Sequence, residues 1–425
     1  MSETTEIVTL SNGLRVLCDY SRQAESAALG VWIAVGSRLE ASCRQGISHF
    51  LEHMLFKGTR RRSHRRIARE IEGRGGVLNG FTSEEHTCYW AAVRSGRFLS
   101  ALDLLFDLVW HPRLDSAEIE KEKGVVKEEI RLYRDHPAHY AAQLIQETMW
   151  PDQPLGRPVL GTEQSVEDLQ RNDLVHHQRA CHRPSRMVLA VCGNAPPDKV
   201  FRAVSKIKAP APGASPPRLR CARFSSAPKA RVASRPIEQA HLCLGFKGLD
   251  RSHPERFTLA LLNIILGGNM SSRLFQEMRE RKGWAYSVAS HLNFYYDSGD
   301  LVVTAGILPA RAAAGARLIL KEIEKLVSRP VSLPELNRAR EYFWGRTILE
   351  WEKTVSRMLS LGEHLISLNE VLSLKEIEKE IKQITPERIR SLAASIFKPG
   401  AGRLALVGPA DVSGEVAAGW MDQGE

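Results

Sequence analysis

The sequence predicts an α+β protein made of two similar halves, each a mixed or antiparallel sheet packed with helices. The alternating apolar run at 27–35 has a counterpart at 240–246, and the run at 187–193 has one at 403–408. The two members of each pair are roughly 215 residues apart. Within each half, strand-like runs follow one another directly as well as alternating with longer helical segments. A constant offset over several elements indicates a duplicated domain.

A change in composition divides the chain between the two halves. Proline at high density disfavours both helices and central strands, so residues 209–235 are expected to form an extended linker. The prolines in or beside this segment are Pro210, Pro212, Pro216, Pro217, Pro228 and Pro236. We therefore expect an N-terminal domain at 1–208, a Pro/Ala-rich linker at 209–235 and a C-terminal domain at 236–425.

The composition is that of an ordinary globular protein. Of the 425 residues 43% are hydrophobic and 25% charged, which excludes global disorder and fibrous repeats. The longest mostly apolar runs, at 26–36 and 258–266, are about half as long as a membrane-spanning helix. No secretory signal is visible at the N-terminus. The seven cysteines are scattered without a Cys-x-x-Cys pair, which favours free thiols. We expect a cytoplasmic protein without membrane association.

The net charge of +10 is moderate, and its densest patch is the segment 59–69. This segment is compatible with a solvated helix face, with a collar that attracts acidic peptides, or with a nucleic-acid surface. It lacks interleaved aromatic residues and opens a predicted surface helix, so the solvated face is favoured. We expect no nucleic-acid partner.

The segment 46–58 carries the most chemical information. Its apolar residues recur at the spacing of one helix face, and they are Ile47, Phe50, Leu51, Met54 and Leu55. At 100° per residue, His49, Glu52 and His53 cluster on the opposite face. The segment therefore predicts an amphipathic helix with a polar, potentially reactive face.

The spacing His-x-x-Glu-His on that face is the inverted zinc-peptidase arrangement. Two neutral imidazoles one turn apart can bind one Zn²⁺ ion, and the neighbouring carboxylate can take a proton from polarised water. The motif is short, and a helix that merely turns polar residues to solvent would show the same pattern. Both interpretations stay open on these five residues alone.

A zinc site needs a third protein ligand, and the segment 115–135 offers the best candidates. Glu122 and Glu129 are seven residues apart and share one helical stripe, whereas Glu128 points away. The apolar members of that stripe are Ile119, Val126 and Tyr133. Carboxylates among apolar neighbours are costly to bury without a cation, and a metal supplies one. The alternative is a solvated charged helix, because three lysines are interleaved.

With these motifs the chain resembles the pitrilysin/insulinase zinc metallopeptidases, and within them the bacterial processing-type peptidases and the mitochondrial processing peptidase β subunit. The resemblance extends from the segment starting at Leu10 to the final predicted strand near Arg403. It implies the fold already expected from the duplication, and it implies a peptidase.

The resemblance also assigns roles to the candidate residues. It implies that His49, His53 and Glu129, which lies 76 positions after His53, bind one Zn²⁺ ion per chain. Glu52 corresponds to the family's catalytic base. Glu122 corresponds to a supporting acidic residue, which would contact a ligand rather than the metal itself.

The segment 75–89 is similar to a family stretch that forms an edge strand, to which a peptide adds as an extra strand. It implies substrate binding by Asn79, Gly80, Phe81 and Thr82. Gly80 stands where the family usually has alanine, which loosens the strand slightly. From the residues alone, Asn79 and Thr82 also fit ordinary turn or strand positions.

The segment 266–286 is similar to a glycine-led family segment that ends in an Arg…Tyr pair, here Arg279 and Tyr286. The resemblance implies that this pair reaches across a central chamber and donates hydrogen bonds to the substrate carbonyl oxygen. A surface arginine and a core tyrosine are the alternative. The counterpart of the metal helix, at 261–266, offers no ligand, so one domain holds the metal and we expect a clamshell that closes around the chamber.

Together these features predict a zinc-dependent endopeptidase that hydrolyses short or unfolded peptides in the enclosed chamber. Relatives of this size usually pair two chains, which implies a homodimer or a heterodimer with a sister subunit. The alternative is a catalytically silent binding or scaffold subunit of a hetero-oligomeric processing peptidase. Such subunits typically lack metal ligands, whereas every expected ligand position is filled here.

Overall fold

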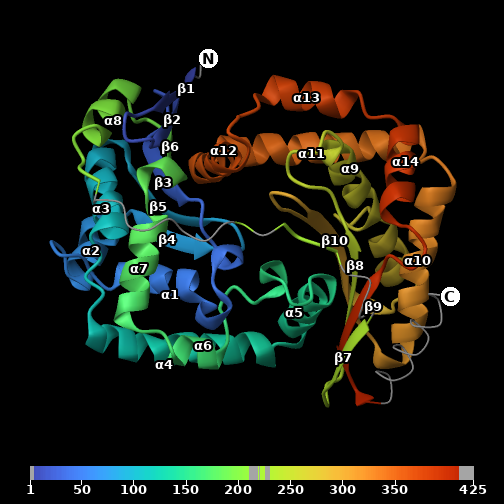
Figure 1. The fold of residues 1–425 in the computed structure, drawn as a ribbon. Helices are drawn as coiled ribbons and strands as arrows, with labels where there is room; N and C mark the ends of the chain where they lie inside the picture. Colours follow the sequence, from blue (N-terminus) through green and yellow to red (C-terminus); the bar gives the residue numbers. More distant parts are fainter. Residues whose placement is uncertain (1–3, 210–218, 220, 225–229, 411–425) are drawn as a thin grey trace. The chain divides into compact units, whose positions relative to one another are not determined.

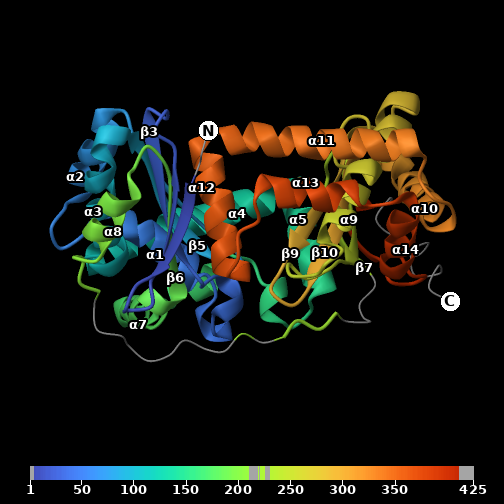
Figure 2. The ribbon, with the colours of Figure 1, turned by 90° about the horizontal axis from the view of Figure 1, so that it is seen from above.

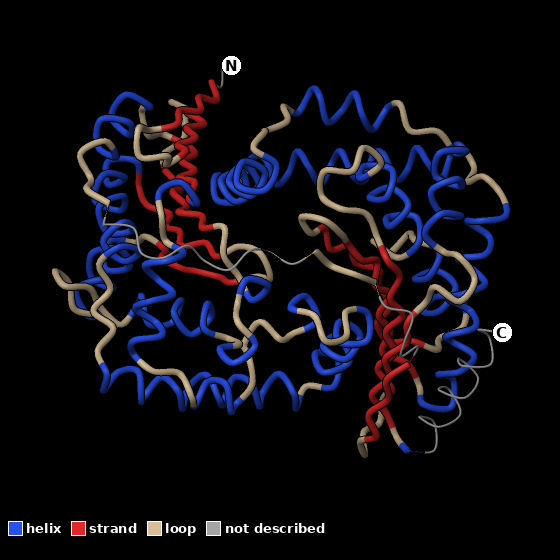
Figure 3. Tube along the Cα trace, viewed as in Figure 1, coloured by secondary structure: helices blue, strands red, loops and turns tan. Residues whose placement is uncertain are grey.

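The structure, a computed structural model, describes residues 4–209, 219, 221–224 and 230–410 (Figure 1). The chain forms two compact units, and each combines segments from distant parts of the sequence. The first unit consists of residues 1–130, 157–220 and 348–371, and the second of residues 131–156, 221–347 and 372–425. Each unit contains one β-sheet with helices on both faces (Figure 3).

The sheet of the first unit has six strands and is mixed. β2 and β6 run parallel, and the other neighbours are antiparallel. β4 lies at one edge, so no described strand pairs with its outer side. The order is β1 (Thr4–Thr9), β2 (Arg15–Tyr20), β6 (Met187–Gly193), β3 (Ser26–Ile33), β5 (Thr87–Arg94) and β4 (Val77–Thr82).

Side-chain alternation along these strands supplies two apolar faces. Val16 and Cys18 of β2 contribute to the larger core, whereas Leu17 between them belongs to the smaller one. The larger core is covered by α1 (Ile47–Phe56), α3 (Phe98–Trp110), α4 (Ser116–Asp135), α7 (Arg171–Cys181) and α8 (Pro197–Val204). The smaller core is covered by α12 (Thr354–Leu368), which lies along β3 and β6 (Figure 2).

The sheet of the second unit repeats this topology with five strands. Its parallel pair is β7–β11, the counterpart of β2–β6. The order is β7 (Ala230–Ser234), β11 (Arg403–Gly408), β8 (Ala240–Lys247), β10 (Gly299–Ile307) and β9 (Ala285–Phe294). The expected pairs β3/β8 and β6/β11 therefore occupy equivalent positions, and the predicted α+β duplication is confirmed.

Helices also cover both faces of the second sheet. One face packs against α9 (Arg256–Leu266), α10 (Ala312–Ser328) and α14 (Pro386–Ile396), and the other against α5 (Pro137–Met149). The remaining helices are α2 (His64–Ile71), α6 (Glu163–Glu167), α11 (Leu333–Glu352) and α13 (Leu374–Lys382). A π-helical turn spans Phe275–Arg281.

The compact units differ from the contiguous domains expected at 1–208 and 236–425. Residues 131–156 pack with the second unit, and residues 348–371 pack with the first. The physical reason is that each sheet has a second apolar face, which is covered in one unit by α12 and in the other by α5. Each half of the sequence therefore supplies one helix to the other unit: α5 packs on the second sheet, and α12 packs on the first.

The expected linker at 209–235 also needs correction. Residues 230–234, inside the expected linker, form strand β7, which pairs with β11. Residues 210–218, 220 and 225–229 of this segment lie outside the described residues. Within the described ranges, no helix is long and apolar enough to cross a lipid bilayer.

The basic segment 59–69 is partly paired inside the first unit. The guanidinium of Arg62 lies 2.7 Å from Asp107, 2.5 Å from Asp103 and 2.9 Å from Glu70. Its side chain is only 8% exposed, so these contacts tie the loop after α1 to α2 and α3. This part of the positive patch has a structural role.

Gly362 tests the packing of α12 on the first sheet. A Cβ there would overlap the indole of Trp32, whereas a Cβ at Gly345 of α11 would meet nothing within 4 Å. We expect Gly362→Ala to lower the free energy of unfolding by about 1–3 kcal/mol through overpacking. Gly345→Ala should raise it by about 0.5–1 kcal/mol through helix propensity. Urea denaturation measures both, and equal stabilities would contradict this packing.

Candidate metal centre

The position of α1 is fixed at its first turn. The buried carboxylate of Glu40 accepts hydrogen bonds from the backbone N–H groups of Gly46 (2.7 Å) and Ser48 (2.8 Å). A negative charge is favourable at a helix N-terminus, where these donors have no intrahelical partner. Burial raises the pKa of Glu40 to about 7, and the hydrogen bonds from Ser48 and Gly46 act in the opposite direction. Gly46 has φ 83°, and a Cβ there would overlap the carbonyl of Leu160.

The predicted amphipathic helix is confirmed over Ile47–Phe56. Its apolar residues are at most 2% exposed, and they are Ile47, Phe50, Leu51, Met54 and Leu55. Burial of this face leaves His49, Glu52 and His53 on the opposite side of α1, the side on which the α4 carboxylates contact the two histidines. The helix register is therefore set by the core, and the polar face follows from it.

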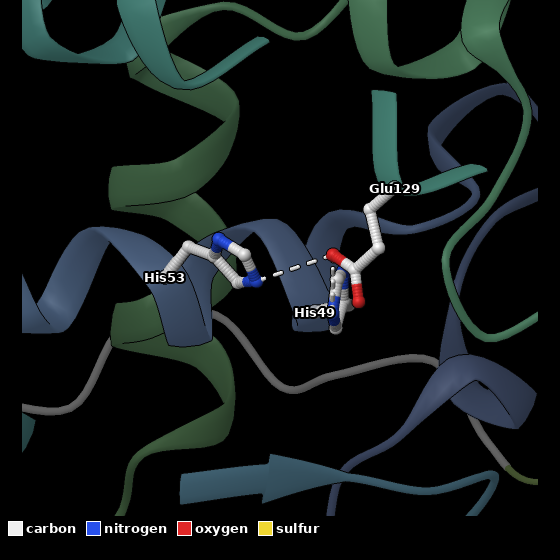
Figure 4. A group of neighbouring side chains, drawn as sticks. All are labelled: His49, His53 and Glu129. Atoms are coloured by element: carbon white, nitrogen blue, oxygen red, sulfur yellow. Dashed lines mark ion pairs between the residues drawn. The ribbon is translucent and has the colours of Figure 1, made fainter. Parts of the chain in front are cut away.

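The three predicted metal ligands converge on one point (Figure 4). Glu129 Oε2 lies 3.7 Å from His49 Nε2 and 3.6 Å from His53 Nε2. One ligand atom from each residue lies within 4.8 Å of the other two, and no second group of this kind exists among the described residues. Zinc binds imidazole nitrogen and carboxylate oxygen at about 2.0–2.2 Å, so its tetrahedral donors are about 3.4 Å apart. The three side chains fit such an ion after small adjustments.

His53 is oriented by a carboxylate on α4. Its Nδ1 lies 2.9 Å from Glu122 Oε1, so an Nδ1–H donor leaves the Nε2 lone pair facing Glu129. Lys57 Nζ lies 2.5 Å from Glu122 Oε2. Burial opposes the charged forms of both His53 and Glu122. The hydrogen bond and attraction between them outweigh it, so the pKa of His53 is raised and that of Glu122, also paired with Lys57, is lowered.

His49 differs electrostatically from His53. Burial, followed by the charge of His53, lowers the pKa of His49 to about 4. The imidazole is therefore neutral near pH 7, which is the form that binds a metal. Its Nδ1 has no hydrogen-bond partner among the described residues.

Glu52 lies beside this group and is 9% exposed. Burial raises its pKa, and the hydrogen bond from Thr82 and the charge of His53 partly offset this effect. Glu128 on α4 is exposed, whereas Glu129 faces the histidines, as the helical wheel predicted.

The four predicted substrate-binding residues form the end of the edge strand β4. Asn79 Oδ1 accepts a hydrogen bond from the Gly80 N–H (2.8 Å), and Phe81 packs edge-on against Trp32 with ring centroids 5.5 Å apart. Thr82 contacts Glu52. The edge strand is thus present, and contact with a substrate stays a prediction.

Arg279 and Tyr286 belong to the second unit. The Arg279 guanidinium lies 5.6 Å from the centroid of the Tyr286 ring, in cation–π geometry. Tyr286 is 75% exposed, so the alternative of a core tyrosine is wrong. The role of the pair in catalysis stays a prediction.

Sequence reasoning missed Glu40 and Lys57. Lys57 caps the C-terminus of α1 and follows His53 by four residues, about one helical turn, and this spacing could have identified it as a neighbour of His53. Glu40 acts from a preceding loop, and its hydrogen bonds to the start of α1 have no sequence signature.

Glu129 and Glu128 form a matched pair for testing the third ligand. Glu129→Gln removes an anionic donor, so we expect zinc content to fall from about one ion per chain to nearly none. Glu128→Gln makes the same chemical change one position away and should keep the metal. Elemental analysis after dialysis measures both, and equal zinc contents would contradict the assignment.

Glu122→Gln tests the orientation of His53. The substitution keeps the side-chain size but removes the charge that holds the Nδ1–H tautomer and Lys57. We expect zinc affinity to fall about 10–100-fold. Competition with a chromogenic chelator measures it, with Glu128→Gln as the control, and an unchanged affinity would show that the contact is dispensable.

Two family models match the chain. Residues 15–163, which include His49, Glu52, His53 and Glu129, match the model described as Insulinase (Peptidase family M16). Residues 168–343, which include Arg279 and Tyr286, match the model described as Peptidase M16 inactive domain.

Bacterial relatives are similar over nearly the whole chain. The uncharacterized zinc protease YmxG of Bacillus subtilis is 37% identical over 407 residues, covering 94% of this chain and 97% of the relative. The uncharacterized zinc protease Rv2782c of Mycobacterium tuberculosis is 36% identical, covering 94% and 92%, respectively. The uncharacterized zinc protease SCO5738 of Streptomyces coelicolor is 34% identical, covering 96% and 90%.

Solved structures share the fold at lower identity. A protease from Helicobacter pylori has a TM-score of 0.89 at 22% identity, covering 96% of this chain and all of the other. A peptidase M16 inactive domain from Pseudomonas fluorescens has a TM-score of 0.85 at 18% identity, covering 96% and 98%. These two support the fold.

Proposed function

The chain belongs to the insulinase family of peptidases, family M16, and from this premise we propose that it is a zinc-dependent endopeptidase acting on short or unfolded peptides. The observation that carries the proposal is the convergence of His49, His53 and Glu129, with the Glu52 carboxylate beside them. The relatives named as zinc proteases support the choice of metal.

The ligand set would hold the ion through two neutral imidazoles and one carboxylate. When bound, zinc supplies Lewis-acid polarisation of a peptide carbonyl and of water. Glu52 takes a proton from the attacking water and returns it to the leaving amine. Its burial raises its pKa and so strengthens it as a base. The free edge of β4 would hold the peptide in an extended conformation by backbone hydrogen bonds.

Arg279 and Tyr286 complete the proposal. Both side chains can donate hydrogen bonds to a carbonyl oxygen that gains negative charge. The exposed phenol of Tyr286 is available for such a contact. The fully charged guanidinium of Arg279 would contribute the larger electrostatic share.

The competing function is a catalytically silent scaffold subunit. The name of the second family model refers to an inactive domain, and it matches residues 168–343. α9, the counterpart of α1 in that region, offers no histidine, glutamate, aspartate or cysteine. In the first unit every ligand and the base are present, and this favours the enzyme.

The compartment and the assembly remain parts of the proposal. All seven cysteines are free thiols, in agreement with a reducing cytoplasm. As for partners, we propose a peptide substrate and a second chain, either an identical copy or a sister subunit.

Glu52→Gln tests the mechanism directly. The variant should keep about one zinc per chain, because the ligands are intact. It should lose at least about 10²–10⁴-fold in turnover, because the general base is removed. Elemental analysis and cleavage of a quenched fluorescent peptide library, with and without a chelator, measure the two properties.

Glu128→Gln is the control for this test and should cleave at the wild-type rate. Turnover by Glu52→Gln at the wild-type rate would contradict the mechanism. A wild-type chain that binds zinc and cleaves no peptide would favour the scaffold subunit.

A further inference from the structure

One face of β4 lies directly against the catalytic helix. Residues 78, 80 and 82 share that face, since side chains alternate along a strand. Leu78 packs against the core beneath α1. A Cβ on Gly80 would lie 3.2 Å from Phe56 Cζ and 3.3 Å from Glu52 Cγ. Thr82, next on the same face, brings its hydroxyl to the carboxylate of Glu52.

The contact between Thr82 and Glu52 is short and direct. Thr82 Oγ1 donates to Glu52 Oε2 at 2.6 Å, a length typical of an O–H···O⁻ hydrogen bond. Among the described residues, no other donor contacts this carboxylate. One carboxylate oxygen is therefore held, and the other is left for the attacking water.

Thr82 is itself held firmly. Threonine is branched at Cβ, so its side-chain rotamers are restricted. The preceding Phe81 packs on Trp32, and Thr82 pairs with Thr87 at the end of the ladder. The chain then turns at Ser83, whose N–H donates to the His86 carbonyl (2.8 Å). The backbone of β4 therefore sets the direction in which the Thr82 hydroxyl points.

We propose that Thr82 is a positioning residue that sets the rotation of the Glu52 carboxylate relative to the substrate strand. The inference rests on the function proposed above. A hydroxyl has one proton, and because that proton is donated to Glu52, it is not available to the substrate. In this proposal the Thr82 side chain serves Glu52 and not the peptide, as an alternative to the expected substrate contact, which stays a prediction. It also links the general base to the strand on which the peptide would lie.

A valine at position 82 keeps the branched shape and removes the donor. The Glu52 carboxylate would then rotate about its last bond and lose its only described partner. Misorientation of a base slows the chemical step and leaves ground-state binding of the peptide unchanged. Thr82→Ser, which keeps the hydroxyl, should restore the contact.

The first experiment compares kcat and KM for wild type, Thr82→Val, Thr82→Ser and Thr87→Val. We expect Thr82→Val to lower kcat about 10–100-fold, the usual effect of losing a supporting contact, with zinc content and KM unchanged. Thr82→Ser should retain most of kcat. Thr87→Val is the matched control, since the Thr87 hydroxyl donates to the Val35 carbonyl and does not touch Glu52; it should lower the melting temperature and spare kcat.

The second experiment measures peptide affinity without turnover. Glu52→Gln and the double variant Glu52→Gln/Thr82→Val are titrated with a labelled peptide. Equal affinities support positioning, whereas weaker binding by the double variant would show a substrate contact and overturn the proposal.

The outcomes separate the two hypotheses. An active wild type whose kcat is unchanged in Thr82→Val would overturn the role of Thr82 and leave the proposed function intact. A wild type that binds zinc and cleaves nothing would overturn both.

Discussion

The whole site depends on how α1 is held in the first unit. Its apolar face is buried in the core, and Glu40 accepts the N–H groups of Gly46 and Ser48 at its start. These two constraints fix the rotation of α1 about its own axis and its position along that axis. Rotation by a single residue, about 100°, would turn His49 and His53 away from α4. Stability and metal geometry are therefore set by the same contacts.

The duplication explains why, among the described residues, the candidate metal centre lies in only one unit. α9 occupies the place of α1, but its sequence is apolar around most of its circumference, and Leu259, Leu261 and Leu262 are fully buried. A helix of that kind contributes core contacts and no ligand. Removal of the polar face in one copy leaves the sheet topology intact, because the core needs only the apolar positions.

Local periodicity was enough to predict α1 and to predict that Glu129 rather than Glu128 faces the histidines, since these depend on neighbours within one element. The equivalence of β3 and β8 was predictable from the constant offset between similar apolar runs. The exchange of α5 and α12 was not predictable, because which sheet a helix covers depends on long-range packing. The strand β7 was missed because five residues beside prolines give little signal. The hydrogen bond from Thr82 to Glu52 depends on how close β4 lies to α1, and no residue spacing in the sequence encodes that distance.

The remaining constraint is charge. Glu52, Glu122 and Glu129 lie around the two histidines, and with neutral imidazoles the only ammonium paired with them in the described structure is that of Lys57. When all three carboxylates are ionised and both imidazoles are neutral, the ammonium leaves two unbalanced negative charges in a partly desolvated site. Such a site is costly by itself, and a divalent cation at the point between His49, His53 and Glu129 balances it. The arrangement of charges thus favours a divalent cation at this point, and the proposed Zn²⁺ meets this condition.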